Sequence, residues 1–582
     1  MVDFWPQSGG QTWRLIAQAV DDGRVAFNRA CVHLEPWQIV SYTVSVAFLT
    51  LWFRRMMKSD RPISKRIRAA VFSAVRNIPW VKAQIEEEME KARKDLEDTV
   101  HQFDRKKEFY KFLPEHGLPP DAILSEAEMY EAMGEYTFVD GRVSGVVYAD
   151  HDDEHRKLLE KMFSIFAYSN PLHPDLFPGV RKMEAEIVRI VCALLHGGTS
   201  SCGTVTSGGT ESIILACLAY RNRAYERGIR RPEMIVPVTA HSAFDKASQL
   251  LHIRIHHVPV DKNQRADIGA MKRAINNETC MLAQRYGIPL HVDACLGGFL
   301  LPFMERCDFA VPPFDFRVSG VTSISVDTHK YGFAPKGTSL ILYREVNLLH
   351  HQYFCYGDWP GGIYATPTLS GSRNGCAIAL TWATLLYYGR LRYTERTQAI
   401  IEATRLVRAG IESNPHLEPL GDSDVSVVAF TSNKFNIYAL ADRMNKVGWT
   451  LSTLQNPPAV HVCVTMNHTK SGVVDEFLRD LSSACEDLIA NPDLQHTRTA
   501  AIYGMASAVP DKCLVEEVSY MFLDSCYAMP APVLAGRTLS IEGRKMSLIG
   551  GQLPTFSPGG LVASATTSDP IYETKPTQNS LT

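Results

Sequence analysis

The stretch SISVDTHKYGFAPKGTSLILY (323–343) decides the fold of this chain. It reads as two apolar strands joined by a loop that holds Lys330 among glycines. Most lysines lie in solvent, but this one follows a buried strand, where loss of hydration would lower the pKa of its ammonium group. Lys330 is therefore a candidate functional residue.

Two earlier motifs are also placed to bind a ligand. TSGGTES (206–212) precedes an apolar helix, and glycines and hydroxyls at a helix N-terminus offer free N–H groups to a phosphate. An ordinary Ser/Thr helix cap would fit this motif as well. PLHVDACLGGFL (289–300) predicts a strand that ends at Asp293, and ligands bind at the carboxyl ends of strands in open α/β sheets.

A phosphate cradle, an aspartate and a lysine, in that order, are the residues that pyridoxal 5'-phosphate (PLP) chemistry needs. Lys330 would form the Schiff base, and Asp293 would pair with the pyridinium nitrogen so that the ring acts as an electron sink. His241 in TAHSAFDKA (239–247) lies between them in the chain and is placed to stack on the ring. For His241 alone, helix capping or core packing is the alternative.

The rest of the body predicts an α/β protein with two domains. Residues 141–395 alternate strands and helices, which indicates a large domain with a mostly parallel sheet covered by helices on both faces. Residues 396–530 predict a small C-terminal α/β domain, with strands in DVSVVAFTS (424–432) and AVHVCVT (459–465) and a helix over 473–490.

The N-terminal region contains one long uncharged stretch, residues 36–53, which as a helix would span ~27 Å and predicts a single transmembrane helix. Seven Lys/Arg and one acid follow between residues 54 and 68, which places residues 1–35 in the lumen and the body in the cytosol. Residues 54–140 predict a juxtamembrane helical segment, and residues 531–582, rich in Ser, Thr, Pro and Gly, predict a disordered tail.

Composition excludes several other classes of function. The net charge of −3 gives no reason to expect nucleic-acid binding, and the 13 cysteines form no CxxC pair, which argues against zinc ribbons and a disulfide framework. His252, His256 and His257 follow strand alternation without partners at metal-ligand spacing, so we expect no metal site.

Five stretches resemble the sphingosine-1-phosphate lyase family. DTHKYG within SVDTHKYGFAPKG (325–337) is similar to the wider group of PLP decarboxylases, and the added APKG and NPLHPDLFPG make the lyase resemblance specific. The resemblance covers roughly residues 30–530, including the N-terminal anchor. The stretches are NPLHPDLFPGVRKMEAE (170–186), SCGTVTSGGTES (201–212), HVDACLGGF (291–299), SVDTHKYGFAPKG (325–337) and DWPGGIYATPTLSGSR (358–373).

The resemblance implies a type I PLP-dependent transferase fold that cleaves sphingosine 1-phosphate and related long-chain base phosphates between C2 and C3. The products are a fatty aldehyde and phosphoethanolamine. It also implies a homodimer anchored in the endoplasmic reticulum membrane by a signal anchor, with Tyr364 reaching the neighbouring subunit.

The resemblance also assigns roles to individual residues. Lys330 is the PLP lysine, and the other cofactor-binding residues are Gly209, Thr210, His241, Asp293, Thr328 and His329. Tyr148 or a nearby base would take the proton of the C3 hydroxyl, while His173 and Lys336 would bind the substrate phosphate. Asn170 and Tyr364 complete the substrate site.

One segment departs from this pattern. CMLA (280–283) predicts the start of one strand and PLHVDA (289–294) the next, with only QRYGI between them. Consecutive parallel strands need a crossover of about a dozen residues or more, so five cannot make it. The resemblance implies a strand end, a loop and a helix here, so roughly two to three dozen residues are expected to be missing.

Two alternative functions follow from these observations. A PLP-dependent amino-acid decarboxylase would have the same fold but would leave the membrane anchor unexplained. A catalytically impaired isoform with a binding or regulatory role is favoured by the short crossover.

Overall fold

The computed structural model describes residues 9–57, 71–72, 75–105, 109–134, 138–275, 287–422, 425–495, 497 and 512–529. All of them belong to one unit, Met1–Met529. The predicted tail and the predicted CMLA strand lie outside the described residues.

The N-terminal region is helical, with α1 (Gly9–Ala30), α2 (Pro36–Met57), α4 (Pro79–Val100) and α5 (Pro120–Glu131). None of the helices in the described ranges is long and apolar enough to cross a membrane, and this includes α2. The structure therefore does not show the predicted transmembrane helix over residues 36–53, because polar side chains such as Gln38 and Thr43 lower the hydropathy of this stretch.

The central sheet has four strands in the order β1 (Cys202–Thr206), β6 (Ser339–Tyr343), β5 (Val321–Val326) and β4 (Leu290–Asp293). β4 and β5 are parallel, whereas β6 runs antiparallel to both β1 and β5. β1, β5 and β4 therefore point the same way, so their carboxyl ends meet at one edge of the sheet, and β6 is the reversed strand among them.

Helices pack on this sheet. α7 (Pro178–Leu194) contacts β1, and α8 (Gly209–Glu226), which directly follows β1, contacts β5 and β6. Every residue of β6 is buried, which explains its continuous apolar pattern SLILY. α6 (Asp153–Phe166) begins where the Asp152 side chain accepts a hydrogen bond from the backbone N–H of His155.

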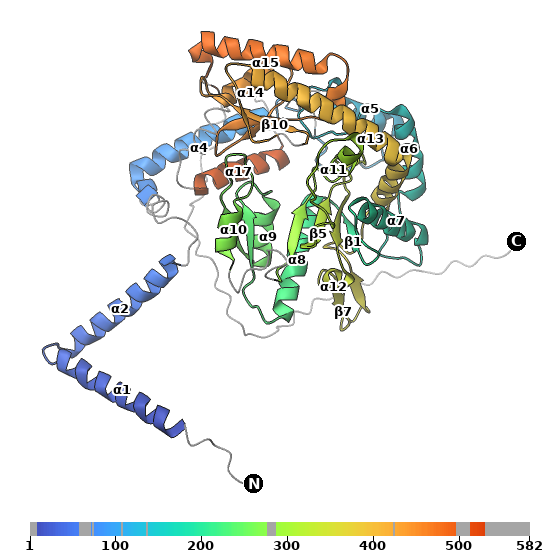
Figure 1. Ribbon diagram of the computed structural model, residues 1–582. Coiled ribbons are helices and arrows are strands. Elements are labelled where there is room, and N and C mark those ends of the chain that lie inside the picture. The colour runs from blue at the N-terminus through green and yellow to red at the C-terminus, as the bar shows by residue number, and fades with distance from the viewer. Residues whose placement is uncertain are drawn as a thin grey trace, which may run out of the picture. The chain divides into compact units, whose positions relative to one another are not determined.

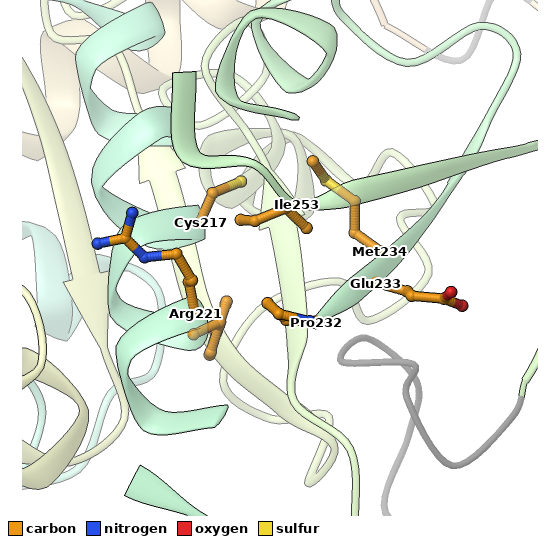
Figure 2. A pocket seen from close by; sticks show the side chains of 7 residues that line it. Cys217, Arg221, Pro232, Glu233, Met234 and Ile253 are labelled. Atoms are coloured by element: carbon orange, nitrogen blue, oxygen red, sulfur yellow. The ribbon is translucent and has the colours of Figure 1, made fainter. Parts of the chain in front are cut away.

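A second, separate sheet is formed by β2 (Glu233–Pro237) and β3 (Arg254–Val258), which are parallel and flank α9 (Ala243–Leu251). Within the described residues, β2 pairs only with β3 and β4 only with β5, so no described strand links the two sheets. The predicted short crossover, residues 284–288, lies largely outside the described residues. A small pocket between α8 and the start of β2 is shown in Figure 2, lined by Cys217, Tyr220, Arg221, Pro232, Glu233, Met234 and Ile253.

The C-terminal lobe contains the antiparallel sheet β11 (Ser452–Leu454), β12 (Ala459–Cys463), β10 (Val427–Thr431) and β9 (Glu418–Leu420), with α14 (Ile437–Lys446) and α15 (Val473–Ala490). α13 (Gly375–Ser413) packs on α6 and α7 and also contacts α15 and β10 (Figure 1). The predicted domain boundary at 395/396 thus lies inside a helix, six residues or so after its kink at Gly389.

The remaining α-helices and strands in the described ranges are short, except for the 16-residue α17. They are α10 (Ile268–Ala274), α11 (Leu301–Met304), α12 (Val346–His350), β7 (Phe354–Tyr356), β8 (Tyr364–Thr366) and α17 (Lys512–Tyr527), which packs on α4.

Candidate active site

Lys330 lies in the loop after β5, where its Nζ is 2.9 Å from Oδ2 of Asp327. The Lys330 side chain is 24% exposed and that of Asp327 only 2%. The lysine side chain is therefore partly exposed, whereas its counterion is almost fully buried.

This ion pair corrects the expected protonation of Lys330. Burial does act to lower its pKa, as predicted, but the charge and hydrogen bond of Asp327 outweigh burial and the pKa is raised. Asp327 was not predicted as a site residue. Its position three residues before the lysine in DTHK was the available signal, but only the folded loop shows that the two side chains meet.

The neighbouring loop residues are fixed by β6 and the turn before it. Thr328 Oγ1 donates to Thr338 at 2.8–3.1 Å and is fully buried, so it supports the loop rather than facing a ligand. His329 contacts the Thr338 carbonyl through Nδ1, and burial lowers the pKa of its ring. Thr328 and His329, both predicted to bind the cofactor, therefore differ in exposure, since Thr328 is fully buried and the His329 side chain is 13% exposed.

The TSGGTES motif lies against the same loop. A Cβ at Gly209 would stand 2.8 Å from Asp327 Oδ1 and 2.9 Å from Cys295 Sγ, closer than side chains approach, so only glycine fits. Ser207 donates to Glu211 through both its N–H and its hydroxyl at 2.7 Å, which holds the turn before α8. Thr210 is exposed at the helix start.

Asp293 ends β4 at the same edge and is exposed. Its Oδ1 accepts a hydrogen bond from the backbone N–H of Cys295 at 3.1 Å and another from Ser325 Oγ at 3.2 Å. His241 is also exposed, and its Nδ1 accepts from the N–H of Ala243 at 3.1 Å, which fixes the ring at the start of α9.

Tyr148 is buried against Tyr331, with ring centroids 4.8 Å apart, and Lys336 Nζ lies 5.3 Å from the Tyr148 ring centroid. Burial raises the pKa of Tyr148 well above its usual value, with smaller contributions from Cys463 and Asp327. Burial and the charge of Lys330 lower the pKa of Lys336. Tyr148 thus keeps its proton at neutral pH, and of the two predicted possibilities, Tyr148 or a nearby base, this favours a nearby base for the C3 hydroxyl proton.

The NPLHPD and SGSR motifs are joined directly. Asn170 donates through Nδ2 to Ser372 Oγ at 3.1 Å and accepts through Oδ1 from the N–H of Arg373 at 3.2 Å. Arg373 also pairs through both terminal nitrogens with Glu184, and both side chains are mostly buried. This buried pair, missed from the sequence, fixes the two motifs to α7. His173 is exposed, and its backbone carbonyl accepts from Phe177.

Tyr364 lies on the β7–β8 hairpin, with its ring 6.1 Å from Trp359 and 6.2 Å from Phe354. Its hydroxyl lies against Gly371, next to the Ser372 that accepts from Asn170. The structure therefore brings together Lys330, Asp327, Gly209, Cys295, Lys336 and Tyr148, whereas Tyr364 lies beside the Asn170–Ser372 contact.

These side chains fit PLP. Lys330 could react with the PLP aldehyde, and the glycine-lined N-terminus of α8 could bind the PLP phosphate. The exposed carboxylate of Asp293 could pair with the ring nitrogen. Asp327 Oδ1 is moreover buried with no hydrogen-bond partner among the described residues, as expected of a polar site that is completed by a bound group.

Comparisons with known proteins agree with this geometry. The family description "Pyridoxal-dependent decarboxylase conserved domain" matches residues 277–433. The chain is 41% identical to sphingosine-1-phosphate lyase 1 of Mus musculus, over 88% of this chain and 94% of the mouse protein. It is 40% identical to sphingosine-1-phosphate lyase of Drosophila melanogaster, over 87% and 96%.

Solved structures give the same fold. Sphingosine-1-phosphate lyase of Burkholderia pseudomallei is similar with a TM-score of 0.63 and 38% identity, covering 67% of this chain and 95% of that one. Glutamate decarboxylase of Lactobacillus brevis has a TM-score of 0.57 at 20% identity, covering 67% and 98%, and supports the PLP-dependent decarboxylase-like fold alone.

Proposed function

Because this chain belongs to the sphingosine-1-phosphate lyase family, we propose that it uses PLP to cleave phosphorylated long-chain bases between C2 and C3, which gives a fatty aldehyde and phosphoethanolamine. The observation that carries this proposal is the meeting of three separate motifs at one sheet edge. Cys295 after β4 and Asp327 after β5 lie within contact distance of Gly209 after β1. Cys295 is two residues from Asp293, and Asp327 is three residues from Lys330.

In this proposal Lys330 holds the cofactor covalently, the N–H groups at the start of α8 bind its phosphate, Asp293 pairs with its ring nitrogen and His241 stacks on its face. PLP supplies, when bound, the electron sink that takes up the electron pair left at C2 when the C2–C3 bond breaks. Lys336 offers a cation to the substrate phosphate. The proton of the C3 hydroxyl goes to a nearby base, and Tyr148, whose burial raises its pKa, would supply the proton that C2 gains.

The test is product analysis with the purified full chain, PLP and a long-chain base phosphate. The expected products are a fatty aldehyde and phosphoethanolamine in equal amounts, with Lys330→Ala as the blank. Carbon dioxide release from amino acids instead would favour the decarboxylase alternative. PLP binding without either product would favour the catalytically impaired isoform.

The homodimer is part of this proposal. The β7–β8 hairpin exposes a cluster of large apolar side chains, and such a cluster on a soluble surface marks an interaction site. A second copy of this chain is the proposed occupant, with Tyr364 of one subunit reaching the other's site. The exposed side chains are Phe354 (54%), Tyr356 (49%), Trp359 (52%) and Ile363 (86%).

Subunit mixing tests the shared site. Lys330→Ala and Tyr364→Phe are each expected to be inactive alone, and equal mixing should restore about a quarter of wild-type activity. Half of the randomly formed dimers are mixed, and one of the two sites in each has both residues intact. Absence of recovered activity, when tagged subunits demonstrably exchange, would contradict a site shared in this way.

Attachment to the endoplasmic reticulum membrane through α2 is also part of this proposal. Its support is that α2 exposes apolar side chains from Trp37 to Leu51, which water would not favour. Charge asymmetry around the helix would put the N-terminus in the lumen and the body in the cytosol. The side chains are Trp37, Val40, Tyr42, Val44, Val46, Phe48, Leu49 and Leu51, each more than half exposed.

Protease treatment of sealed microsomes tests both attachment and orientation. A C-terminal epitope should be cut without detergent, while an N-terminal epitope is protected. Val46→Lys combined with Phe48→Lys should release the protein to the soluble fraction, whereas Ala83→Lys on α4 should not. A shielded C-terminal epitope would show the opposite orientation, and membrane retention of the double variant would exclude α2 as the anchor.

A further inference from the structure

A buried line of hydrogen bonds runs from α8 through β5 and β4 to Asp293. Ser325 Oγ donates to Asp293 Oδ1 at 3.2 Å and lies 3.2 Å from His291 Nε2. The other ring nitrogen, His291 Nδ1, lies 2.7 Å from Ser323 Oγ, which in turn contacts the hydroxyl of Tyr220. Every side chain in the line except Asp293 itself is less than 9% exposed.

The direction of the protons along this line follows from its last member. A carboxylate can only accept, so the single hydroxyl proton of Ser325 goes to Asp293, and Ser325 Oγ must accept from His291 Nε2–H. The histidine then carries its proton on Nε2, and Nδ1 accepts from Ser323. Ser323 Oγ, whose own proton goes to His291, can only accept from Tyr220, and the single hydroxyl proton of Tyr220 is also within reach of Thr322 Oγ1 at 2.7 Å. Each donor thus points toward Asp293.

His291 suits this role because it is neutral. Burial lowers its pKa to about 4, and the nearby charge of Asp293 opposes that shift only in part. The ring packs edge-on against Phe244 of α9, with centroids 6.0 Å apart, so its orientation is fixed from the helix that begins beside His241.

The line ends on Oδ1 of Asp293, and no described residue bonds to Oδ2, which is thus open to a ligand. Both Ser325 Oγ and the N–H of Cys295 donate to Oδ1. A carboxylate held by two donors on one oxygen is fixed in rotation, and aligned donors polarise one another toward the charge. A line of buried groups that converges on an exposed carboxylate is more than core packing needs, since hydroxyls in a core need only bond to the backbone.

We propose that His291 is the positioning residue for Asp293, acting through Ser325 to orient the carboxylate and to stabilise its charge for the ring nitrogen of PLP. This inference rests on the proposed function, because it needs the cofactor to bind where that function places it. It extends the site to three buried residues, His291, Ser323 and Ser325, that do not touch the cofactor.

The test measures PLP affinity by absorbance titration, together with melting temperature in the absence of PLP. Ser325→Ala removes the donor to Asp293 and should weaken PLP binding about tenfold, as expected for a hydrogen bond to a charged group. His291→Leu should weaken it at least as much, whereas His291→Gln, which can still donate to Ser325, should restore most of the affinity. The absorbance of bound PLP should also shift in Ser325→Ala, because its ring nitrogen is no longer paired in the same way.

Thr404→Val is the matched control. It also removes a buried hydroxyl, but one that donates only to the Ile400 carbonyl within α13. It should leave PLP affinity unchanged while altering the PLP-free melting temperature about as much as Ser325→Ala does. Wild-type PLP affinity and spectrum in Ser325→Ala would overturn the positioning role. So would a PLP affinity of His291→Gln that is no higher than that of His291→Leu. If wild-type protein bound no PLP at all, the proposed function would fail first and this inference with it.

Discussion

Lys330→Ala is expected to abolish covalent attachment of PLP and to reduce aldehyde release by roughly a thousandfold or more, because no other amine can replace the nucleophile that holds the cofactor. The structure places the Lys330 amine over a buried carboxylate beside the glycines of the phosphate cradle. Borohydride reduction of the holoenzyme followed by peptide mapping checks the prediction. A pyridoxyl label on any other lysine would contradict it.

Lys336→Ala is the matched variant, since Lys336 lies in the same loop but contacts the Tyr148 ring instead of Asp327. It should keep the covalent label and raise KM for phosphorylated substrates about tenfold to a hundredfold, as loss of one charge-assisted contact to phosphate would. An unchanged KM would show that the substrate phosphate binds elsewhere.

The Lys330–Asp327 pair also predicts how cofactor loading depends on pH. Asp327 raises the pKa of Lys330, so near neutral pH the amine is protonated and cannot attack the PLP aldehyde. Loading of the PLP-free protein should therefore become faster as the pH rises. Asp327→Asn removes the charge and leaves burial, which acts to lower the pKa, so this variant should load faster at neutral pH. Equal loading rates in both proteins would contradict this.

The chain order of the motifs was enough to predict the cofactor chemistry, because Lys330, Asp293 and the TSGGTES turn each carry a local signal. What could not be predicted is how the side chains pair. Asp327 looked like part of a motif around the lysine, and only the loop geometry turns it into the counterion. Tyr148 or a nearby base was expected to take the proton of the C3 hydroxyl, and burial of Tyr148 against Tyr331, far along the chain, raises its pKa and favours its protonated form.

The fold shows the same division between local and long-range information. The apolar run of β6 predicted a buried strand, but an apolar run carries no direction, and the strand is antiparallel to its neighbours. Kinked α13 crosses the predicted domain boundary, since helical periodicity continues on both sides of Gly389. The short link before Asp293 predicts a crossover that lacks residues, because crossover length can be counted in the sequence. Most of that link lies outside the described residues, so this stays a prediction.

Restoring a full crossover is expected to raise both stability and turnover. In the described residues β2 pairs only with β3 and β4 only with β5, although Met234, Ile235 and Val236 of β2 are nearly fully buried. A strand between the two sheets would add ladder hydrogen bonds worth roughly 0.5–1.5 kcal/mol each and would bury more apolar surface at about 25 cal/mol per Å². A gain of several kcal/mol should raise the melting temperature by about 10 °C.

The experiment replaces residues 284–288 with the corresponding crossover of the mouse relative and compares melting curves and aldehyde release side by side. A Gly/Ser insert of equal length is the control, because it relieves the short link but supplies no strand or helix. The native crossover should raise turnover at least tenfold, since β4 carries Asp293 and an unpaired edge leaves that carboxylate less firmly placed. If the Gly/Ser insert matched the native crossover, chain tension at the link would be the defect and the missing strand would not. If neither insert changed stability or turnover, the two sheets would form a complete fold without a strand between them. The helices that pack on the sheets, chiefly α8 and α9, would then hold them together.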